Sequence, residues 1–435
     1  MRSAVVSLSS TGFALLGALL VAISFGLARF AFGLYVPPIR EELGLSALAI
    51  GLISALPLLS FLLSSALAPW LTDRLGARLT ALISTSFAVL GLGLISTAWN
   101  PMMLAIGVFA CGLCTGLMMP ALTAAMQVLV RRSLQGRVSA ILNAGTSVGI
   151  MIAVPTVLLL TEAWRVTYLG FAMMAAVGAV AAWLLLPSVS RIVPANVATP
   201  APLPELPWSR LVRLALFCFT TGFISSAYWI FAPDLVTTLS RYPAQASALL
   251  WLAVGLAGLG GAVIADLADR NNPPITQALM IMILAASMAL LAASPNQILL
   301  STFSALMFGL AYMSLSGLHL MTGIRLLPGR LAAGPVVPFM AIAVGQAVGS
   351  PIAGRLIQTL GHADAFAVFA ALGVTVAILS PFYPGSIAQA DEDYDTDYEG
   401  LQGAIDQQMQ TETGEPLADF MATDSAAQEP LTTET

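Results

Sequence analysis

The sequence predicts an all-α membrane protein with twelve transmembrane helices in two pseudo-symmetric six-helix bundles and a disordered acidic C-terminal tail. Composition is the first reason: hydrophobic residues make up 58% of the chain and charged residues 9%, whereas about 25% of a soluble domain is charged. The second reason is that the apolar runs are about 20 residues long, the length of a membrane-spanning helix. We therefore expect the lipid bilayer to be the solvent of this chain.

The predicted helices follow one another with a single long interruption. The twelve apolar runs lie near 12–37, 47–71, 79–98, 102–130, 138–160, 166–187, 211–239, 245–265, 275–293, 297–326, 334–358 and 363–383. The interruption is rich in Pro and Ala, which favours a linker over a helix. The sequence therefore predicts a first bundle at 1–187, a cytoplasmic linker at 188–210, a second bundle at 211–385 and a tail at 386–435.

Arginine placement predicts the orientation of these helices. The chain has 17 arginines and no lysine, and an inside N-terminus puts twelve arginines on cytoplasmic segments against four on outer ends. Positive residues concentrate on the cytoplasmic side, so we expect a multi-pass inner-membrane protein with both termini in the cytoplasm. The tail holds 13 of the 22 acidic residues and no cation, which predicts disorder. Either a merely solvated tail or a regulatory one fits this composition.

Arg29 lies inside the first apolar run, eight residues before Pro37. On a helical wheel it falls between small residues and aromatic ones, while the opposite side is bulky and suited to lipid. An arginine facing lipid costs about 2.5–3.5 kcal/mol at the centre of the bilayer, so we expect Arg29 to face a cavity. It would there bind an anionic group of a substrate, or be tied to carbonyls or an acid of another helix. The bulky side carries Leu20, Ile23, Leu27, Phe30, Ala31 and Leu34.

An internal repeat relates the two predicted bundles. "GLARFAFGLYVP" at 26–37 resembles "GFISSAYWIFAP" at 222–233, and this pairing sets Arg29 against Ser225. The fifth and eleventh predicted helices also resemble each other, since each has two glycines four residues apart and then a proline. Glycines at this spacing allow close helix packing, and a proline permits a bend, so we interpret them as packing or hinge positions. They are Gly145, Gly149 and Pro155, and Gly345, Gly349 and Pro351.

The loop "PWLTDRLGAR" at 69–78 resembles the signature loop of the major facilitator superfamily. Asp73, Arg74 and Arg78 match its charged positions, although Pro69 replaces its first glycine. A degenerate second copy, "DLADRNN" at 266–272, supplies Asp269 and Arg270. The resemblance implies that these charges latch the cytoplasmic side of the bundles and change partners during transport. The alternative is a cluster that only sets topology. The chain also resembles a bacterial subgroup of uncertain substrate that shares G-x-x-R-F-A-x-G.

Few other polar residues interrupt the apolar runs. We predict Asn143, Tyr228, Trp229 and Gln346 as substrate-binding residues together with Arg29, with helix packing as the alternative. His319 and Asp234 are the candidate proton relays, although a satisfied polar histidine and a solvated carboxylate are the simpler interpretations. His319 and His362 are the two histidines of the chain, and neither is part of a catalytic pattern of paired residues. Cys111 and Cys114 lie mid-helix without a second ligand pair, so we expect no metal.

These observations predict a secondary active transporter that moves a small organic solute, anionic or zwitterionic, by alternating access. Efflux of hydrophobic compounds by proton antiport is one alternative, and a non-transporting receptor that signals through the acidic tail is another. We expect no enzyme activity and no cofactor, and the lack of lysine excludes a Walker phosphate loop. The expected partners are a small-molecule substrate, the bilayer and protons as coupling ion, with no nucleic acid and a monomeric state.

Overall fold

The computed structural model describes residues 9–160, 163–186, 206–239, 248–258, 260, 272–327 and 333–384. All of them belong to the compact unit Met1–Pro384. The second unit, Gly385–Thr435, contains the predicted acidic tail and lies outside the described residues, as do Asp269 and Arg270.

The predicted all-helical fold is confirmed, since the described residues form helices and no strand. Ten segments among them are long and apolar enough to cross a membrane. An eleventh apolar helix, Ala248–Gly258, is shorter and covers part of the run predicted at 245–265. The helices of the N-terminal half are α1 (Ser10–Val21), η1 (Ala22–Phe30), α2 (Ala31–Leu34), α3 (Val36–Leu43), α4 (Ala47–Ser96), α5 (Pro101–Leu129), α6 (Arg132–Leu160) and α7 (Trp164–Leu185). Those of the C-terminal half are α8 (Trp208–Leu239), α10 (Pro273–Ala293), α11 (Ile298–Leu326), α12 (Ala333–Leu360), α13 (His362–Leu379) and η2 (Ser380–Phe382).

The runs predicted at 47–71 and 79–98 are joined in α4, which is 50 residues long. Its helical path breaks at Gly76, with φ 80° and ψ 164°. Only glycine adopts this conformation without strain, because a Cβ would clash with the backbone. The glycine of the signature-like loop is therefore where one membrane span ends and the next begins.

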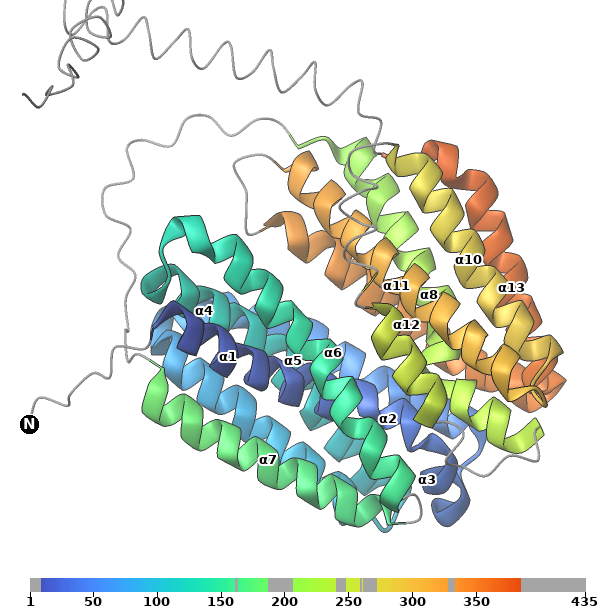
Figure 1. Cartoon of the computed structure of the whole chain (residues 1–435), viewed down its shortest axis with the longest axis horizontal. Coiled ribbons are helices and arrows are strands. Elements are labelled where there is room, and N and C mark those ends of the chain that lie inside the picture. The colour runs from blue at the N-terminus through green and yellow to red at the C-terminus, as the bar shows by residue number, and fades with distance from the viewer. Residues whose placement is uncertain are drawn as a thin grey trace, which may run out of the picture. The chain divides into compact units, whose positions relative to one another are not determined.

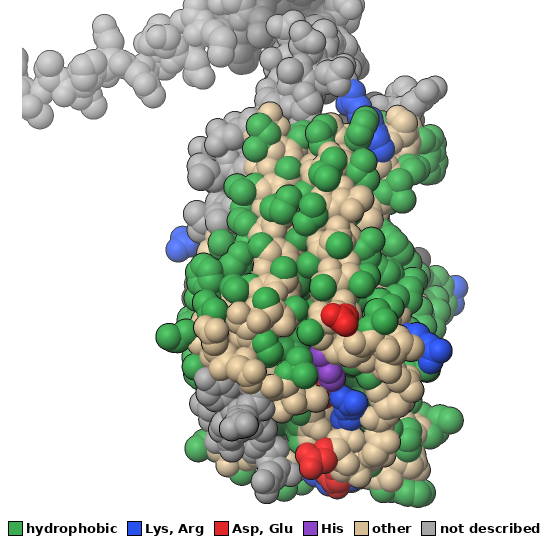
Figure 2. Space-filling model, turned by 90° about the vertical axis from the view of Figure 1, so that its right-hand side faces the viewer, with side chains coloured by type: hydrophobic (Ala, Val, Ile, Leu, Met, Phe, Trp, Pro, Cys, Tyr) green, Lys and Arg blue, Asp and Glu red, His purple; other side chains and the backbone are tan. Residues whose placement is uncertain are grey.

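The first helix of each half is the most enclosed. The segments Ser10–Leu34 and Trp208–Leu239 are 67% and 72% buried inside the protein, against 33% for Trp164–Leu185. The prediction that the bulky face of the first helix meets lipid is wrong: Leu20, Leu27 and Leu34 are each at most 1% exposed. The physical reason is that neighbouring helices cover this side of the helix, so its bulky face packs against protein. Lipid-facing side chains lie instead on outer helices, and Figure 2 shows one face covered mainly by hydrophobic side chains with few charges.

Glycine stripes pack α6 on the first helix of the N-terminal half and α12 on the first helix of the C-terminal half. A Cβ on Gly149 would lie 2.3 Å from the backbone oxygen of Ala22, and one on Gly345 would lie 2.0 Å from that of Phe219. A Cβ on Gly145 would lie 2.3 Å from the backbone oxygen of Ala18, and one on Gly349 would lie 2.6 Å from that of Phe223. The repeat seen in the sequence is thus a repeated close packing of backbones. Both helices continue through their prolines, Pro155 and Pro351.

The two halves meet at one end of the helices (Figure 1), where α2 and α3 lie beside α8, and α4 beside α12. We call this the Asp234 end; the opposite end, with Asp73, is the Asp73 end. A large hydrophobic cluster joins both halves here and includes Leu27, Tyr35 and Trp251. The cluster around Phe13 and Ala77, towards the Asp73 end, contains residues of the N-terminal half alone. Among the described residues, the shared core therefore lies towards the Asp234 end.

Candidate functional site

A small cavity lies between the two halves, and both contribute to it. Its volume is about 50 Å³ in this conformation, room for one or two water molecules. The N-terminal half supplies Ala28, Arg29, Phe30, Phe32, Gly33, Ser54, Pro57, Leu58 and Val108. The C-terminal half supplies Ser226, Trp229, Ile230, Gln346 and Ser350. The structure therefore brings three of the five predicted substrate-binding residues to one place: Arg29, Trp229 and Gln346.

Arg29 is held across the interface between the halves. Its Nη2 donates to Oε1 of Gln346 at 3.1 Å, and Nε2 of Gln346 donates to the hydroxyl of Tyr312 at 3.1 Å. The guanidinium carbon lies 5.3 Å from the ring centroid of Phe30 and 5.0 Å from that of Phe61, within the range of cation–π attraction. Arg29 thus faces polar and aromatic protein groups, as its predicted cavity position requires.

A π-helix carries Arg29 into the cavity. The element η1 covers nine residues, and the Ala31 N–H after it bonds the carbonyl of Gly26, five residues back. Gly26 also packs closely on α6, because a Cβ there would lie 2.4 Å from Cα of Gly149. Such wide turns are rare and recur at functional sites. Sequence reasoning assumed a regular α-helix and missed this element.

Aromatic rings cover one wall of the cavity. The Trp229 ring lies 4.8 Å from Phe30, 5.3 Å from Phe308 and 5.2 Å from Tyr312, measured between centroids. Nε1 of Trp251 donates to the backbone oxygen of Phe30 at 3.4 Å, a second tie between the halves. Trp229 is therefore fixed by its neighbours, and its position beside Arg29 is built into the interface.

Two predicted binding residues lie elsewhere. Asn143 is exposed on α6 and its Nδ2 donates to the backbone oxygen of Ser139 at 3.0 Å. Tyr228 is buried inside the C-terminal half, where its hydroxyl pairs with Ser304 at 2.9 Å and its ring stacks on Phe308 at 4.0 Å. Sequence reasoning in turn missed Ser54, Ser226 and Ser350, because serines are common in these helices and only the fold selects these three.

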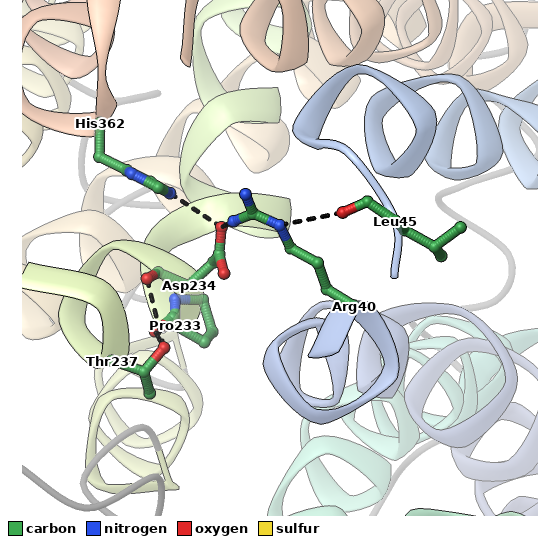
Figure 3. A network of polar contacts seen from close by, with 6 residues as sticks. All are labelled: Arg40, Leu45, Pro233, Asp234, Thr237 and His362. Atoms are coloured by element: carbon green, nitrogen blue, oxygen red, sulfur yellow. Dashed lines mark hydrogen bonds and ion pairs between the residues drawn. The ribbon is translucent and has the colours of Figure 1, made fainter. Parts of the chain in front are cut away.

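Asp234 joins three helices at the Asp234 end (Figure 3). Its Oδ2 accepts from Nη1 of Arg40 at 2.5 Å and from Nε2 of His362 at 2.8 Å. Nε of Arg40 also donates to the backbone oxygen of Leu45 at 3.2 Å. The interpretation of Asp234 as a solvated carboxylate is wrong, because its side chain is 4% exposed. The reason is that α8 continues past Pro233, so Asp234 stays inside a helix packed against α3 and α13.

A second polar cluster fixes α3 within the N-terminal half. Glu42 pairs with Nη1 of Arg165 at 2.8 Å, and its other oxygen accepts from Nε1 of Trp164 at 2.6 Å. Nη2 of Arg165 donates to the backbone oxygen of Ala98 at 2.5 Å. These contacts hold α3 against the start of α7 and the end of α4. They therefore fix the position of α3, which carries Arg40.

Asp73, Arg74 and Arg78, at the Asp73 end, make no ion pair with one another or with any other described residue. Asp73 and Arg74 are exposed, and the Arg74 guanidinium lies 4.7 Å from the ring of Trp70. Arg78 lies over Trp183 of α7 at 4.3 Å. The second copy of the predicted latch, with Asp269 and Arg270, lies outside the described residues.

His319 is enclosed within the C-terminal half. Its Nε2 bonds Oε1 of Gln277 at 3.0 Å, between α11 and α10, and its ring lies 5.7 Å from that of Tyr383. It is not among the residues that line the cavity. Within the described part of the chain, no group of three or more His, Cys, Asp and Glu side chains is placed to hold a metal ion.

The sequence profile of the Major Facilitator Superfamily matches residues 18–334 of the 435-residue chain. The chain belongs to the major facilitator superfamily. It is therefore a multi-pass membrane protein of a transporter family and not an enzyme. The predicted membership in this superfamily is confirmed by this match.

Solved structures of other superfamily-type transporters share this fold. The nucleoside transporter NupG aligns with a TM-score of 0.69 and 15% identity, over 85% of this chain and 98% of NupG. A POT family transporter in complex with 5-aminolevulinic acid aligns with a TM-score of 0.71 and 14% identity, over 86% of this chain and 96% of that chain. A bacterial homologue of the human lysosomal transporter Spinster, inward-facing and unoccupied, gives 0.65 and 12%, over 86% and 95%. Comparison with curated protein sequences gave no match.

Proposed function

We propose that this chain is a secondary active transporter that moves a small organic solute with a negatively charged group by alternating access between its two halves. The observation that carries the proposal is Arg29, a cation placed by the N-terminal half in a cavity and bonded to Gln346 of the C-terminal half. A cation at the interface can couple solute binding to the movement of the halves. When the halves separate, Gln346 moves away from Arg29 and their hydrogen bond is lost.

The packing supports a state that is closed at the Asp234 end. A Cβ on Gly51 of α4 would lie 2.4 Å from the backbone oxygen of Ser350, and one on Gly354 of α12 would lie 2.4 Å from that of Ala47. The Asp234–Arg40 pair adds a buried charge contact between the halves. In the orientation proposed from the arginine distribution, this end faces the outside, and the chain is captured in its inward-facing state.

The same network supports Asp234 as the better of the two candidate proton relays. Its carboxylate bonds Arg40 of one half and His362 of the other, so adding a proton to Asp234 would weaken contacts that close this end. The contacts of His319 stay within the C-terminal half, and its protonation would leave the interface between the halves untouched. We therefore propose Asp234 as the group through which protons drive the conformational change.

Flux in proteoliposomes tests the function. Uptake of radiolabelled benzoate, 5-aminolevulinate and uridine is measured with and without an imposed pH gradient, for the wild type and for Arg29→Ala. The last two probes are chosen because proteins of the same fold bind or carry such solutes. We expect the wild type to move an acidic probe, and Arg29→Ala to insert normally but not to transport. Wild-type flux in Arg29→Ala would refute the role of Arg29, and binding without flux would support the receptor alternative.

A further inference from the structure

The cavity at Arg29 carries an unbalanced positive charge. Arg29 is the one ionisable side chain among its 14 lining residues. The ion pairs among the described residues join Arg40 and His362 to Asp234, and Arg165 to Glu42, all away from the cavity. Arg29 therefore has no described carboxylate within 4 Å, and a neutral amide oxygen is its hydrogen-bond acceptor. A half-buried cation with a neutral partner favours a ligand that brings the missing negative charge.

Two polar groups near Arg29 have donors that are not fully used. The hydroxyl of Ser54 and the indole nitrogen of Trp229 are both buried and make no hydrogen bond of normal geometry with the described residues, and the hydroxyl of Tyr312 lies close enough to interact with the Trp229 indole. The amide oxygen of Gln346 accepts from Arg29, and its amide N–H donates to the hydroxyl of Tyr312. A guanidinium has five N–H donors, so most of those on Arg29 also remain for a ligand. Such a surplus of donors suits a carboxylate, which accepts several hydrogen bonds.

The same cavity offers no negative charge to bind an ammonium group. Its lining has no Asp or Glu, so an ammonium would find only neutral acceptors such as serine hydroxyls. An ammonium would also lie beside the Arg29 charge, and like charges repel strongly where water is excluded. A second carboxylate on the ligand would likewise find no second cation. The charge pattern therefore selects one negative group and rejects other charges.

Aromatic rings lie beside Arg29, next to aliphatic side chains such as Pro57, Leu58 and Ile230. Phe30 and Phe61 flank the guanidinium, and Trp229 packs 4.8 Å from Phe30. Flat rings present wide apolar surface at little entropy cost, and they prefer offset or edge contacts with another ring. The present volume of about 50 Å³ admits a carboxylate but not a ring, so the rings must separate when the ligand body enters.

We propose that the Arg29 cavity binds a monoanion with an apolar, ring-shaped body, of the aromatic monocarboxylate class, and discriminates against zwitterions, dianions and cations. The carboxylate takes the paired donors of Arg29 together with the donors of Trp229 and Ser54. The ring lies among Phe30, Phe61 and Trp229. This inference deepens the transporter function proposed above and rests on it for the biological meaning of the site, but binding itself is measured without transport.

Equilibrium binding to the purified full-length chain tests the inference. The probes share one ring and differ in charge: benzoate, phenylalanine, phthalate, benzylamine and benzyl alcohol, each followed by isothermal titration. Benzoate should bind, and each of the other four should bind weaker by about 10- to 100-fold. Benzylamine and benzyl alcohol lose the charge-assisted hydrogen bond, and phenylalanine and phthalate bring a second charge that finds no partner. Equal affinity for phenylalanine or benzylamine would overturn the inference, as would the absence of benzoate binding.

Variants separate the site from general damage. Arg29→Gln should abolish benzoate binding, and Trp229→Phe, which keeps a ring but removes the indole donor, should weaken it about tenfold. Arg213→Gln is the matched control, because Arg213 is an exposed arginine outside the cavity, and it should bind benzoate like the wild type. Benzoate binding retained in Arg29→Gln would overturn the inference.

Binding and flux results distinguish the two proposals. Arg29-dependent benzoate binding without any flux would leave the substrate class standing and refute the transporter function. Flux of another solute in a chain that does not bind benzoate would leave the transporter function standing and refute the substrate class.

Discussion

Replacing Asp234 with Asn should open the Asp234 end. Asn keeps the shape of the side chain and removes the charge that holds Nη1 of Arg40 at 2.5 Å and Nε2 of His362 at 2.8 Å. Breaking a buried ion pair costs about 3–5 kcal/mol, and an exposed pair contributes about 0–1 kcal/mol. Asp234 is 4% exposed and Arg40 29%, so Arg40 keeps some access to water. We therefore expect the closed state to lose about 2 kcal/mol, or about 30-fold in its equilibrium against the open state.

The assay is accessibility of a cysteine placed in the cavity. Ser54→Cys puts a thiol on the lining, while the native Cys111, Cys114 and Cys218 are buried. A membrane-impermeant maleimide added outside intact cells should label Ser54→Cys slowly, and Asp234→Asn should raise that rate by about 30-fold if opening precedes labelling.

A matched control makes the result specific. Asp364 is an exposed acid two residues from His362, and Asp364→Asn should leave the labelling rate unchanged. An unchanged rate in Asp234→Asn, or an equal rise in Asp364→Asn, would refute the reasoning that Asp234 closes this end.

Three further predictions concern packing and the limits of the site. Gly345→Ala should lower the melting temperature in detergent, since its Cβ would come 2.0 Å from a backbone oxygen of α8 and overpacking costs about 1–3 kcal/mol; Gly93→Ala, with nothing within 4 Å, should not lower it. Tyr228→Phe should lose about 0.5–1.5 kcal/mol of stability with its bond to Ser304 but bind benzoate normally, and a loss of binding would place Tyr228 in the site after all. Asn143→Ala should leave both binding and flux unchanged, because Asn143 is exposed and outside the cavity; reduced flux would contradict this.

Much of the site could be predicted because membrane energetics are severe. A charge inside an apolar run must find a polar environment, and this alone placed Arg29 in a cavity before any contact was known. Gln346 could be predicted because it lies on a glycine-striped helix. Trp229 could be predicted because it lies in the second copy of the first-helix repeat, at 222–233. Asn143 and Tyr228 satisfied the same criteria, yet one is exposed and the other packs inside its own half. A polar residue in an apolar run has many ways to be satisfied, and sequence does not choose between them.

The sequence by itself determined the helical membrane fold, the repeated glycine packing and the inward direction of Arg29, since each follows from local composition and from the cost of polar groups in lipid. The tertiary structure alone decided which distant residues meet. It widened the first helix into a π-helix, enclosed its bulky face in protein, and joined Asp234 to His362, which is 128 residues away in the chain. Charge pairs of this kind form only where three helices pack together, and a local pattern of residues does not predict which helices do so.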